Sequence, residues 1–431
     1  MLDRLFALKA QGVTARGEIV AGTTVFFTMA YILFVNPRIL AAAGMEPGAV
    51  FIATALSAAF ATILMGVYAN LPVAVAPGMG HNAYFAFTVV PLLAGDWRLA
   101  LGCVFLSGVL FVALSASPAR EWLVNAIPQS QKRAIGAGIG FFLALIGFQG
   151  AGLVAASKDT LLQPGNLADP KLLVAALGLF VIAALWARKV TGAVLIGILA
   201  ATAAAFALKL QPLPDLSAPP SFDFISGIAP TFLQLHFTGA PVSVLSVVIL
   251  AFLFLQMLDT SGTLTAVGHQ AGLMQDGKLK NVRKALLCDS TGTMAGAVLG
   301  TSSVTAYVES AAGAGGRTGL VAVTVGVLFL ASLFLAPVAG AVPAYATAPA
   351  LVFVAVLFAK DLKDVEWNDV TEALPALMTA LAIPLTFSIA EGIGVGFLTW
   401  CVVKALAGRW REIHPGMAVI ALAFAAKVAL A

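Results

Sequence analysis

The sequence predicts an all-α protein that crosses a membrane many times. Of its 431 residues, 60% are hydrophobic and only 10% are charged, whereas soluble domains carry roughly 25% charged residues. Apolar runs of about 18 or more residues recur along the chain, each long enough to cross a hydrocarbon core of roughly 30 Å. These runs lack the two-residue alternation of membrane-spanning strands. Since a spanning segment must satisfy its backbone polar groups internally, we expect helices.

The N-terminal half begins with a retained helix rather than a cleaved signal. Arg4, Lys9 and Arg16 precede an apolar stretch that continues to membrane length, and many more such stretches follow. The third stretch, LPVAVAPGMGHNAYFAF, is interrupted by Pro and Gly residues. The expected spans of this half are 19–40, 50–68, 71–87 (the interrupted stretch), 99–114, 134–154, 172–186 and 191–208.

The C-terminal half repeats this plan after a Pro-rich loop, QPLPDLSAPPSFDF, and a weakly amphipathic piece. Its third stretch, GTSSVTAYVESAAGAGG, is again interrupted, here by Gly and Ser residues. The expected spans are 242–268, 285–299, 300–316 (the interrupted stretch), 318–335, 344–358, 373–389 and 392–406. The sequence therefore predicts about fourteen spans, each near the length that a bilayer requires.

Lysine and arginine residues concentrate on one predicted side of the membrane. If the N-terminus is cytoplasmic, the cytoplasmic loops hold Arg120, Lys132, Arg133, Arg188, Lys189, Lys278, Lys280, Arg283, Lys284, Arg317, Lys360, Lys363, Arg409 and Arg411. The opposite loops hold only Arg38, Arg98, Lys158, Lys171 and Lys209. This asymmetry follows the positive-inside rule and favours an even number of spans. We expect a multi-pass protein of the cytoplasmic (inner) membrane, embedded in lipid. The Lys and Arg residues that give the chain its net charge of +4 lie in short loops, so this charge does not indicate nucleic-acid binding.

The two interrupted stretches occupy corresponding positions in the two halves. Such matching breaks indicate an inverted repeat with a binding site where the repeats meet. Backbone freed by a break is tolerated at membrane depth only where protein or a water-filled cavity satisfies it. The alternative is that the glycine runs are close helix-packing surfaces.

Two carboxylates, Asp259 and Glu309, lie within stretches that we expect to be buried in the membrane. A carboxylate there costs several kcal/mol unless it is paired, hydrated or protonated. Gln256, Asp259, Thr260 and Thr263 share one helical face by their spacing. Glu309 follows TSSVTAYV, whose alternating small polar residues are typical of a short extended segment. We interpret both carboxylates as groups that contact a solute or carry a proton; hydrogen bonding to a neighbouring helix is the structural alternative.

Asn82 occupies the place in the first break that Glu309 occupies in the second, and its amide can both donate and accept hydrogen bonds. His81 beside it is a candidate proton-linked switch, and a purely structural role is equally open. Asp289, Glu18 and Glu391 lie near predicted helix ends, where capping or interface roles are expected.

Long motifs throughout the chain carry a family resemblance. They are GTTVFFTMAYILFVNPRIL, LPVAVAPGMGHNAYFAFTVV, LDTSGTL, GTSSVTAYVESAAGAGGRTGL, YATAPAL and LTFSIAEGIGVGF. The sequence resembles the adenine/guanine/hypoxanthine (azaguanine-like) purine permeases, within the nucleobase–ascorbate and uracil permease superfamily. The resemblance implies two inverted repeats of about seven helices each, at 1–208 and 242–431, joined by an extracytoplasmic loop at 209–241. It also implies a core domain (17–115 and 242–338) and a gate domain (133–208 and 344–431).

The activity that the resemblance implies is proton-coupled uptake of guanine, hypoxanthine or adenine by an elevator-type motion, in a homodimer joined through its gate domains. H⁺ is the coupling ion, and no cofactor is expected. Carried over, the substrate-binding residues are Asn82, Asp259, Glu309, Gly80, Thr301, Ser302, His81, Gln256, Phe85 and Phe26. Protonation of Asp259 or Glu309 would neutralise a charge that is costly to move through the membrane.

Two residues depart from the family pattern. Gln256 stands where an acidic residue is frequent, and His81 where an aliphatic one is usual, so either alters base selectivity or proton coupling.

Other classes of protein fit the sequence less well. An anion carrier of related fold would present a cationic site, and a channel would need no matching breaks. The four His and three Cys are scattered, without a nucleophile–base or metal constellation for an intramembrane enzyme. A receptor would leave the buried carboxylates unexplained.

Overall fold

The computed structural model describes residues 2–115, 127–157, 160–212, 224–275, 278–279, 281–313, 316–336 and 340–430. Most of the Pro-rich loop and the loop residues Arg120, Lys158 and Lys280 lie outside these ranges. Eight of the described helices are long and apolar enough to cross a membrane, and three further apolar helices are shorter. A mostly helical, polytopic membrane fold is therefore confirmed, and the number of about fourteen spans stays a prediction.

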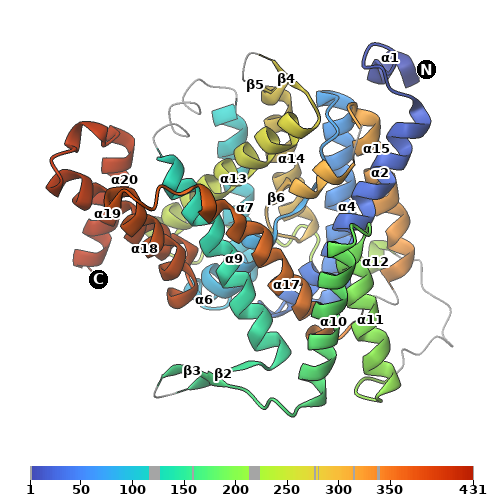
Figure 1. Cartoon of the computed structure of the whole chain (residues 1–431), viewed down its shortest axis with the longest axis horizontal. Helices are drawn as coiled ribbons and strands as arrows, with labels where there is room; N and C mark the ends of the chain where they lie inside the picture. Colours follow the sequence, from blue (N-terminus) through green and yellow to red (C-terminus); the bar gives the residue numbers. More distant parts are fainter. Residues whose placement is uncertain are drawn as a thin grey trace. The chain divides into compact units, whose positions relative to one another are not determined.

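Helices dominate the first half of the chain (Figure 1), and the first interrupted stretch contains a strand. In chain order its elements are α1 (Leu2–Phe6), α2 (Ala15–Met29), α3 (Ile32–Ala41), α4 (Pro47–Leu64), η1 (Met65–Ala69), β1 (Val75–Pro77), α5 (Met79–Tyr84), η2 (Phe85–Val89), α6 (Val90–Leu92), α7 (Trp97–Ser115), α9 (Gln129–Ala151), β2 (Val154–Ser157), β3 (Leu161–Pro164), α10 (Pro170–Ala187) and α11 (Ala193–Ala207).

The second half has the same character. Its elements are α12 (Phe224–Ile228), α13 (Val242–Gln270), β4 (Met274–Gln275), β5 (Lys278–Leu279), α14 (Val282–Leu299), β6 (Val304–Ala306), η3 (Val308–Ala312), α15 (Gly319–Ala331), η4 (Ser332–Leu335), α17 (Ala344–Ala359), η5 (Lys360–Asp364), α18 (Val370–Thr386), α19 (Ile389–Leu406), η6 (Trp410–Glu412) and α20 (Pro415–Leu430).

The predicted span at 19–40 matches a candidate span over Ala15–Ala41. Within it, α2 and α3 are divided at Ala30 and Tyr31, where Leu33 and Phe34 donate their backbone N–H groups to carbonyls only three residues back. Three other predicted spans differ from the structure. The span at 134–154 ends at Ala151, because Gly152 turns the chain with a left-handed φ of +79°. Among their described residues, neither interrupted stretch forms a helix of spanning length: the first contains β1, the short α5 and part of η2, and the second contains β6 and the 3₁₀ turn η3.

The chain divides into two compact units, and each is built from both halves of the sequence. The first unit comprises Met1–Ala116 and Asn166–Ala350, and the second comprises Ser117–Gly165 and Leu351–Ala431. Helices α10 and α11 fall in the first unit. The boundaries of the predicted repeats and of the core and gate domains stay predictions.

Strands β1 and β6, which come from the two interrupted stretches, pair in antiparallel fashion inside the first unit. Val75 lies opposite Ala306, Ala76 opposite Thr305, and Pro77 opposite Val304. All six residues are buried. Because both stretches leave the helical conformation at this point, the ladder satisfies backbone groups that apolar side chains could not.

Two threonines fasten these strands to neighbouring helices in the same way. The hydroxyl of Thr62 in α4 donates to the carbonyl oxygen of Val75 (2.7 Å) and accepts from its N–H (2.9 Å). The hydroxyl of Thr293 in α14 makes both corresponding bonds to Val304, at 2.9 and 3.2 Å. Each strand therefore begins at a residue whose two backbone polar groups are satisfied by one side chain.

The second unit carries a network of ion pairs at the ends of its helices. The buried Lys404 in α19 lies 2.7 Å from both Glu372 and Glu412. Arg409 in turn bonds Asp369, the N-cap of α18. Hydrogen bonds from Thr371 and Arg409 hold the pKa of Asp369 below its ordinary value. The network joins the start of α18 to the end of α19.

The start of α15 approaches η1, the helical segment that directly follows α4, so closely that glycine is required where they meet. A Cβ added to Gly319 would overlap the backbone of Gly66, including its carbonyl oxygen. We expect Gly319→Ala to lower the stability of the protein by about 1–3 kcal/mol, since the clash is with main chain that cannot rotate away. Thermal unfolding in detergent measures this. Gly136→Ala, which meets no atom closer than 3.7 Å, is the matched control; equal melting temperatures for the two variants would contradict the prediction.

Candidate functional site

The paired strands bring the polar residues of both interrupted stretches into one region of the first unit. Helix α5 starts directly after β1, and the N–H of Asn82 donates to the carbonyl of Gly78 in its first turn (2.8 Å). Glu309 follows β6 by three residues and lies in η3. The β1–β6 ladder brings together the segments that carry Asn82 and Glu309, and their joint role in one site stays a prediction.

Asp259, in α13, faces His81 from α5. The Nδ1 atom of His81 lies 3.8 Å from Oδ2 of Asp259, a distance for charge interaction rather than a direct hydrogen bond. The side chain of Asp259 is 30% exposed, whereas that of His81 is 2% exposed. Neither ring nitrogen of His81 has a hydrogen-bond partner among the described residues. The carboxylate is therefore open to a ligand on one side and faces a buried imidazole on the other.

Asn82 is oriented by a residue of the opposite break. The hydroxyl of Ser302 donates to Oδ1 of Asn82, which leaves the amide nitrogen Nδ2 buried without a partner in the described part of the chain. Next to Ser302, the hydroxyl of Thr301 accepts a hydrogen bond from Asn36 of α3 (2.8 Å). The same Asn36 nitrogen donates to Thr54 of α4 (2.7 Å). The first and second breaks are thus joined by side chains as well as by backbone.

Glu309 accepts a hydrogen bond from a tyrosine that the sequence analysis did not select. The hydroxyl of Tyr31 lies 2.7 Å from Oε1 of Glu309. Tyr31 stands at the turn that divides α2 from α3, and this turn aims its side chain toward the second break. The hydroxyl of Tyr307, two residues before Glu309, donates to the carbonyl of Pro77 in β1 (2.6 Å). Both tyrosines are buried.

Gln256 and Asp289 form a fully buried network behind Asp259. Oδ2 of Asp289 accepts from the hydroxyl of Thr260 (2.8 Å) and from the amide of Gln256 (3.4 Å). Thr260 also lies 3.1 Å from the hydroxyl of Thr305 in β6. Of the two roles expected for Asp289, capping is not found, because the residue lies within α14 rather than at its end. The expected interface role is found: Asp289 faces α13, whose Gln256 and Thr260 supply the donors that a buried carboxylate requires.

The other predicted residues are less closely connected. Gly80 and Phe85 are buried in α5 and η2. Phe26 packs edge to face on Phe329 of α15, with ring centroids 5.2 Å apart. Tyr84 packs on Phe252 of α13 at 5.0 Å. The substrate-binding role expected for Phe26 and Phe85 stays a prediction. Glu18, by contrast, accepts from the backbone N–H groups of Arg317 and Thr318 at the start of α15, so its predicted capping role is confirmed.

The site has unsatisfied hydrogen-bonding capacity. The buried side-chain atoms without a partner among the described residues include Nδ1 and Nε2 of His81, Nδ2 of Asn82, Oε1 of Gln256, Oδ1 of Asp289 and Oδ1 of Asn36. An unpaired buried polar atom costs about 1–3 kcal/mol. Several of them near two carboxylates favour a site that takes up a small polar molecule with both donors and acceptors.

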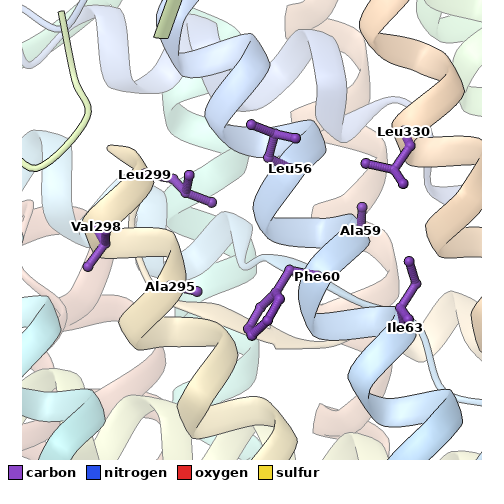
Figure 2. A pocket seen from close by; sticks show the side chains of 8 residues that line it. All are labelled: Leu56, Ala59, Phe60, Ile63, Ala295, Val298, Leu299 and Leu330. Carbon is purple, nitrogen blue, oxygen red and sulfur yellow. The ribbon is translucent and has the colours of Figure 1, made fainter. Parts of the chain in front are cut away.

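A separate groove of the first unit has the opposite chemistry. It has a volume of about 400 Å³ and lies between α4, α14 and α15. Figure 2 shows its eight lining side chains, all of them apolar: Leu56, Ala59, Phe60, Ile63, Ala295, Val298, Leu299 and Leu330. Such a lining suits hydrocarbon and offers nothing to orient a polar solute.

Sequence reasoning missed Tyr31, Asn36 and the site-facing role of Asp289. Asn36 carried an available signal, because an amide within an apolar span requires a partner. Tyr31 carried none, since the turn that directs it toward Glu309 is not marked by a Gly or Pro at that position. Asp289 was misplaced because the predicted span began three residues later than α14 does.

Comparison with known proteins supplies a family and a fold. A permease family profile matches residues 16–395. The chain is 48% identical over 429 residues to the putative permease MJ0326 of Methanocaldococcus jannaschii, covering 98% of this chain and 97% of the relative. It is 44% identical over 432 residues to adenine permease AdeP of Escherichia coli (99% and 96% covered). It is also 44% identical over 433 residues to guanine/hypoxanthine permease PbuO of Bacillus subtilis (97% and 98% covered).

Among solved structures, the transmembrane domain of a cyanobacterium bicarbonate transporter, BicA, is similar. Its TM-score is 0.64 at 17% identity, covering 87% of this chain and 96% of that one. At this identity the likeness shows a shared fold alone.

Thr260 offers a test of the buried network. We expect Thr260→Val to lower the stability of the folded protein by about 1–3 kcal/mol, because the fully buried Asp289 carboxylate loses a hydrogen-bond donor. Thr260→Ser keeps the hydroxyl and serves as the control. Thermal unfolding of both variants in the same detergent measures the difference. A valine variant as stable as the serine variant would show that Thr260 does not support Asp289.

Proposed function

Because this chain belongs to the purine permeases of the nucleobase–ascorbate and uracil permease superfamily, we propose that it imports purine nucleobases together with protons. The family and the names of the relatives support nucleobase transport. The coupling ion, the direction of transport and the elevator-type motion are part of the proposal. AdeP and PbuO are equally identical to this chain, so overall identity does not select among adenine, guanine and hypoxanthine.

The observation that carries the proposal is the convergence of two carboxylates and an amide at the paired breaks. A purine presents ring N–H donors beside carbonyl or ring-nitrogen acceptors. Asp259 and Glu309 are acceptors when ionised. Nδ2 of Asn82 is a donor without a partner among the described residues, while Oδ1 of the same amide accepts from Ser302. A site with both kinds of group discriminates strongly against molecules that leave one of them unpaired.

The same carboxylates provide a reason for proton coupling. An ionised carboxylate in a segment that moves across hydrocarbon carries a large desolvation cost. A proton on Asp259 or Glu309 removes that charge, and release of the proton on the other side restores the empty carrier. The two carboxylates therefore make substrate movement favourable when protons enter with the purine. An anion carrier has no use for two acidic groups at its site.

The elevator-type motion is supported by where the site contacts lie. The bonds that link Asn82, Asp259, Glu309, Gln256 and their partners all join residues of the first compact unit. A site held within one unit can travel with that unit as a body. We propose that the first unit carries the purine, that the second holds the homodimer together in the inner membrane, and that the N-terminus is cytoplasmic.

Uptake by reconstituted vesicles tests the function. We expect radiolabelled guanine, hypoxanthine or adenine, but not uracil, to accumulate when the outside is acidic and the inside is neutral. Glu309→Gln, which keeps the size of the side chain and removes its charge, should abolish the stimulation by the gradient. The exposed Glu366 provides a control, with Glu366→Gln expected to transport normally. Identical, purine-independent flux through wild-type protein and Glu309→Gln would refute the proposal.

A Tyr31 variant tests whether the hydrogen bond from Tyr31 positions Glu309 for substrate binding. A hydrogen bond to a charged group contributes roughly 1.5–3 kcal/mol, so Tyr31→Phe should raise the KM for purine by roughly tenfold to a hundredfold. We expect the maximal rate to change less, because Glu309 itself is still present. Phe27→Leu on the preceding turn, whose exposed ring contacts Phe26, controls for general damage to α2. A Tyr31→Phe variant with the KM of wild type would show that this bond does not position Glu309 for binding.

A further inference from the structure

His81 is the one buried histidine beside an acidic group of the site in the described part of the chain. Its ring lies between α5 and α13, with Nδ1 3.8 Å from Oδ2 of Asp259. The whole residue is 1% exposed, and neither nitrogen has a described hydrogen-bond partner. A neutral imidazole has one nitrogen that donates and one that accepts a hydrogen bond. Buried in this way, it loses its hydrogen bonds to water at both nitrogens and gains none from the described residues around it. Packing alone does not explain a histidine here.

The backbone is shaped to admit the imidazole. A Cβ on Gly78 would lie 2.5 Å from Nδ1 of His81 and 2.6 Å from Cγ2 of Thr305. Gly78 is therefore the residue that lets the ring lie against the end of β1 and face Asp259. The ring is held in place by the fold, while its polar atoms are left available.

The charged surroundings of His81 are acidic. From the elements around it, the titratable side chains are Asp259 of α13, Asp289 of α14, Tyr307 and Glu309 after β6, and Tyr31 before α3. No lysine or arginine is recorded in ion pairing with these groups in the described ranges. A proton that arrives here is attracted by carboxylates and finds two adjacent bases, the imidazole and Asp259.

We propose that His81 and Asp259 hold the transported proton as a pair. This inference deepens the proposed function and rests on it. The proton lies either on the imidazole, beside an ionised Asp259, or on the Asp259 carboxyl, beside a neutral imidazole. Without the proton, the pair carries one negative charge. With the proton, in either form, it carries none, so the His81–Asp259 pair is neutral in the protonated carrier. Two bases that share one proton titrate as a unit and bind it more tightly than either does alone.

The pH dependence of uptake tests the pair. Initial rates of purine uptake are measured at several external pH values with the internal pH fixed. His81→Gln removes one base and keeps a polar side chain, so protonation requires a more acidic medium. We expect its half-maximal uptake to need at least a tenfold higher proton concentration than that of wild type, a shift of one pH unit or more to lower pH. A merely structural role of His81 would lower the rate without moving this midpoint.

His236 provides the matched control. Its Nδ1 lies 3.6 Å from Oδ2 of Asp96, nearly the same spacing, but both side chains are largely exposed and lie outside the site. His236→Gln should keep the wild-type midpoint. If His81→Gln transports purine with the wild-type midpoint, the pair proposal is overturned and the proposed function stands. If wild-type uptake itself ignores the proton gradient, the proton coupling in the proposed function fails.

A second measurement does not depend on transport or on the folding of His81→Gln. In ¹⁵N-histidine-labelled protein in lipid nanodiscs, the ring signal of His81 is followed against pH in wild type and in Asp259→Asn. We expect its midpoint to fall by at least one pH unit in Asp259→Asn, because the imidazolium loses its partner charge. An unchanged midpoint overturns the pair.

Discussion

Strands β1 and β6 supply each other's backbone hydrogen bonds, and the rest of the site depends on this ladder. Each strand comes from a stretch that leaves the helical conformation. Inside a membrane, no water is available to hydrogen-bond the backbone N–H and C=O groups that such a stretch exposes. The ladder pairs Val75 with Ala306, and Thr62 and Thr293 satisfy the groups at its ends. With the backbone satisfied in this way, the residues that follow each strand are free to present polar side chains to a ligand.

Around the ladder, polar contacts link α3, α4 and both breaks into one body. Asn36 ties α3 to α4 and to Thr301, Ser302 orients Asn82, and Tyr31 bonds Glu309. Because these bonds hold the side chains in position before a ligand arrives, little ordering remains to be done on binding. The close helix crossing at Gly66 and Gly319 shows that the surrounding helices are packed as tightly as the backbone permits.

The electrostatic design of the site is acidic and divided into two layers. Asp259 and Glu309 are the carboxylates that we propose contact the ligand, whereas Asp289 is held in α14 by donors from Gln256 and Thr260. The structural difference between the layers is access: Asp259 is partly exposed and Asp289 is fully buried. A partly exposed carboxylate can exchange a proton or bind a purine, while a buried one with fixed partners serves to hold α13 against α14.

The sequence by itself determined the membrane class, most helix positions, the two breaks and the pair of intramembrane carboxylates. Composition, run length and residue spacing are local quantities, and hydrocarbon restricts them severely. Only the tertiary structure decided which residues meet. Tyr31 reaches Glu309 across 278 positions of sequence, and Ser302 reaches Asn82 across 220. Such contacts depend on how the breaks pair and where a helix is divided. Asp289 belongs to the site because α13 packs beside α14, a neighbour relation that spacing within one helix does not encode.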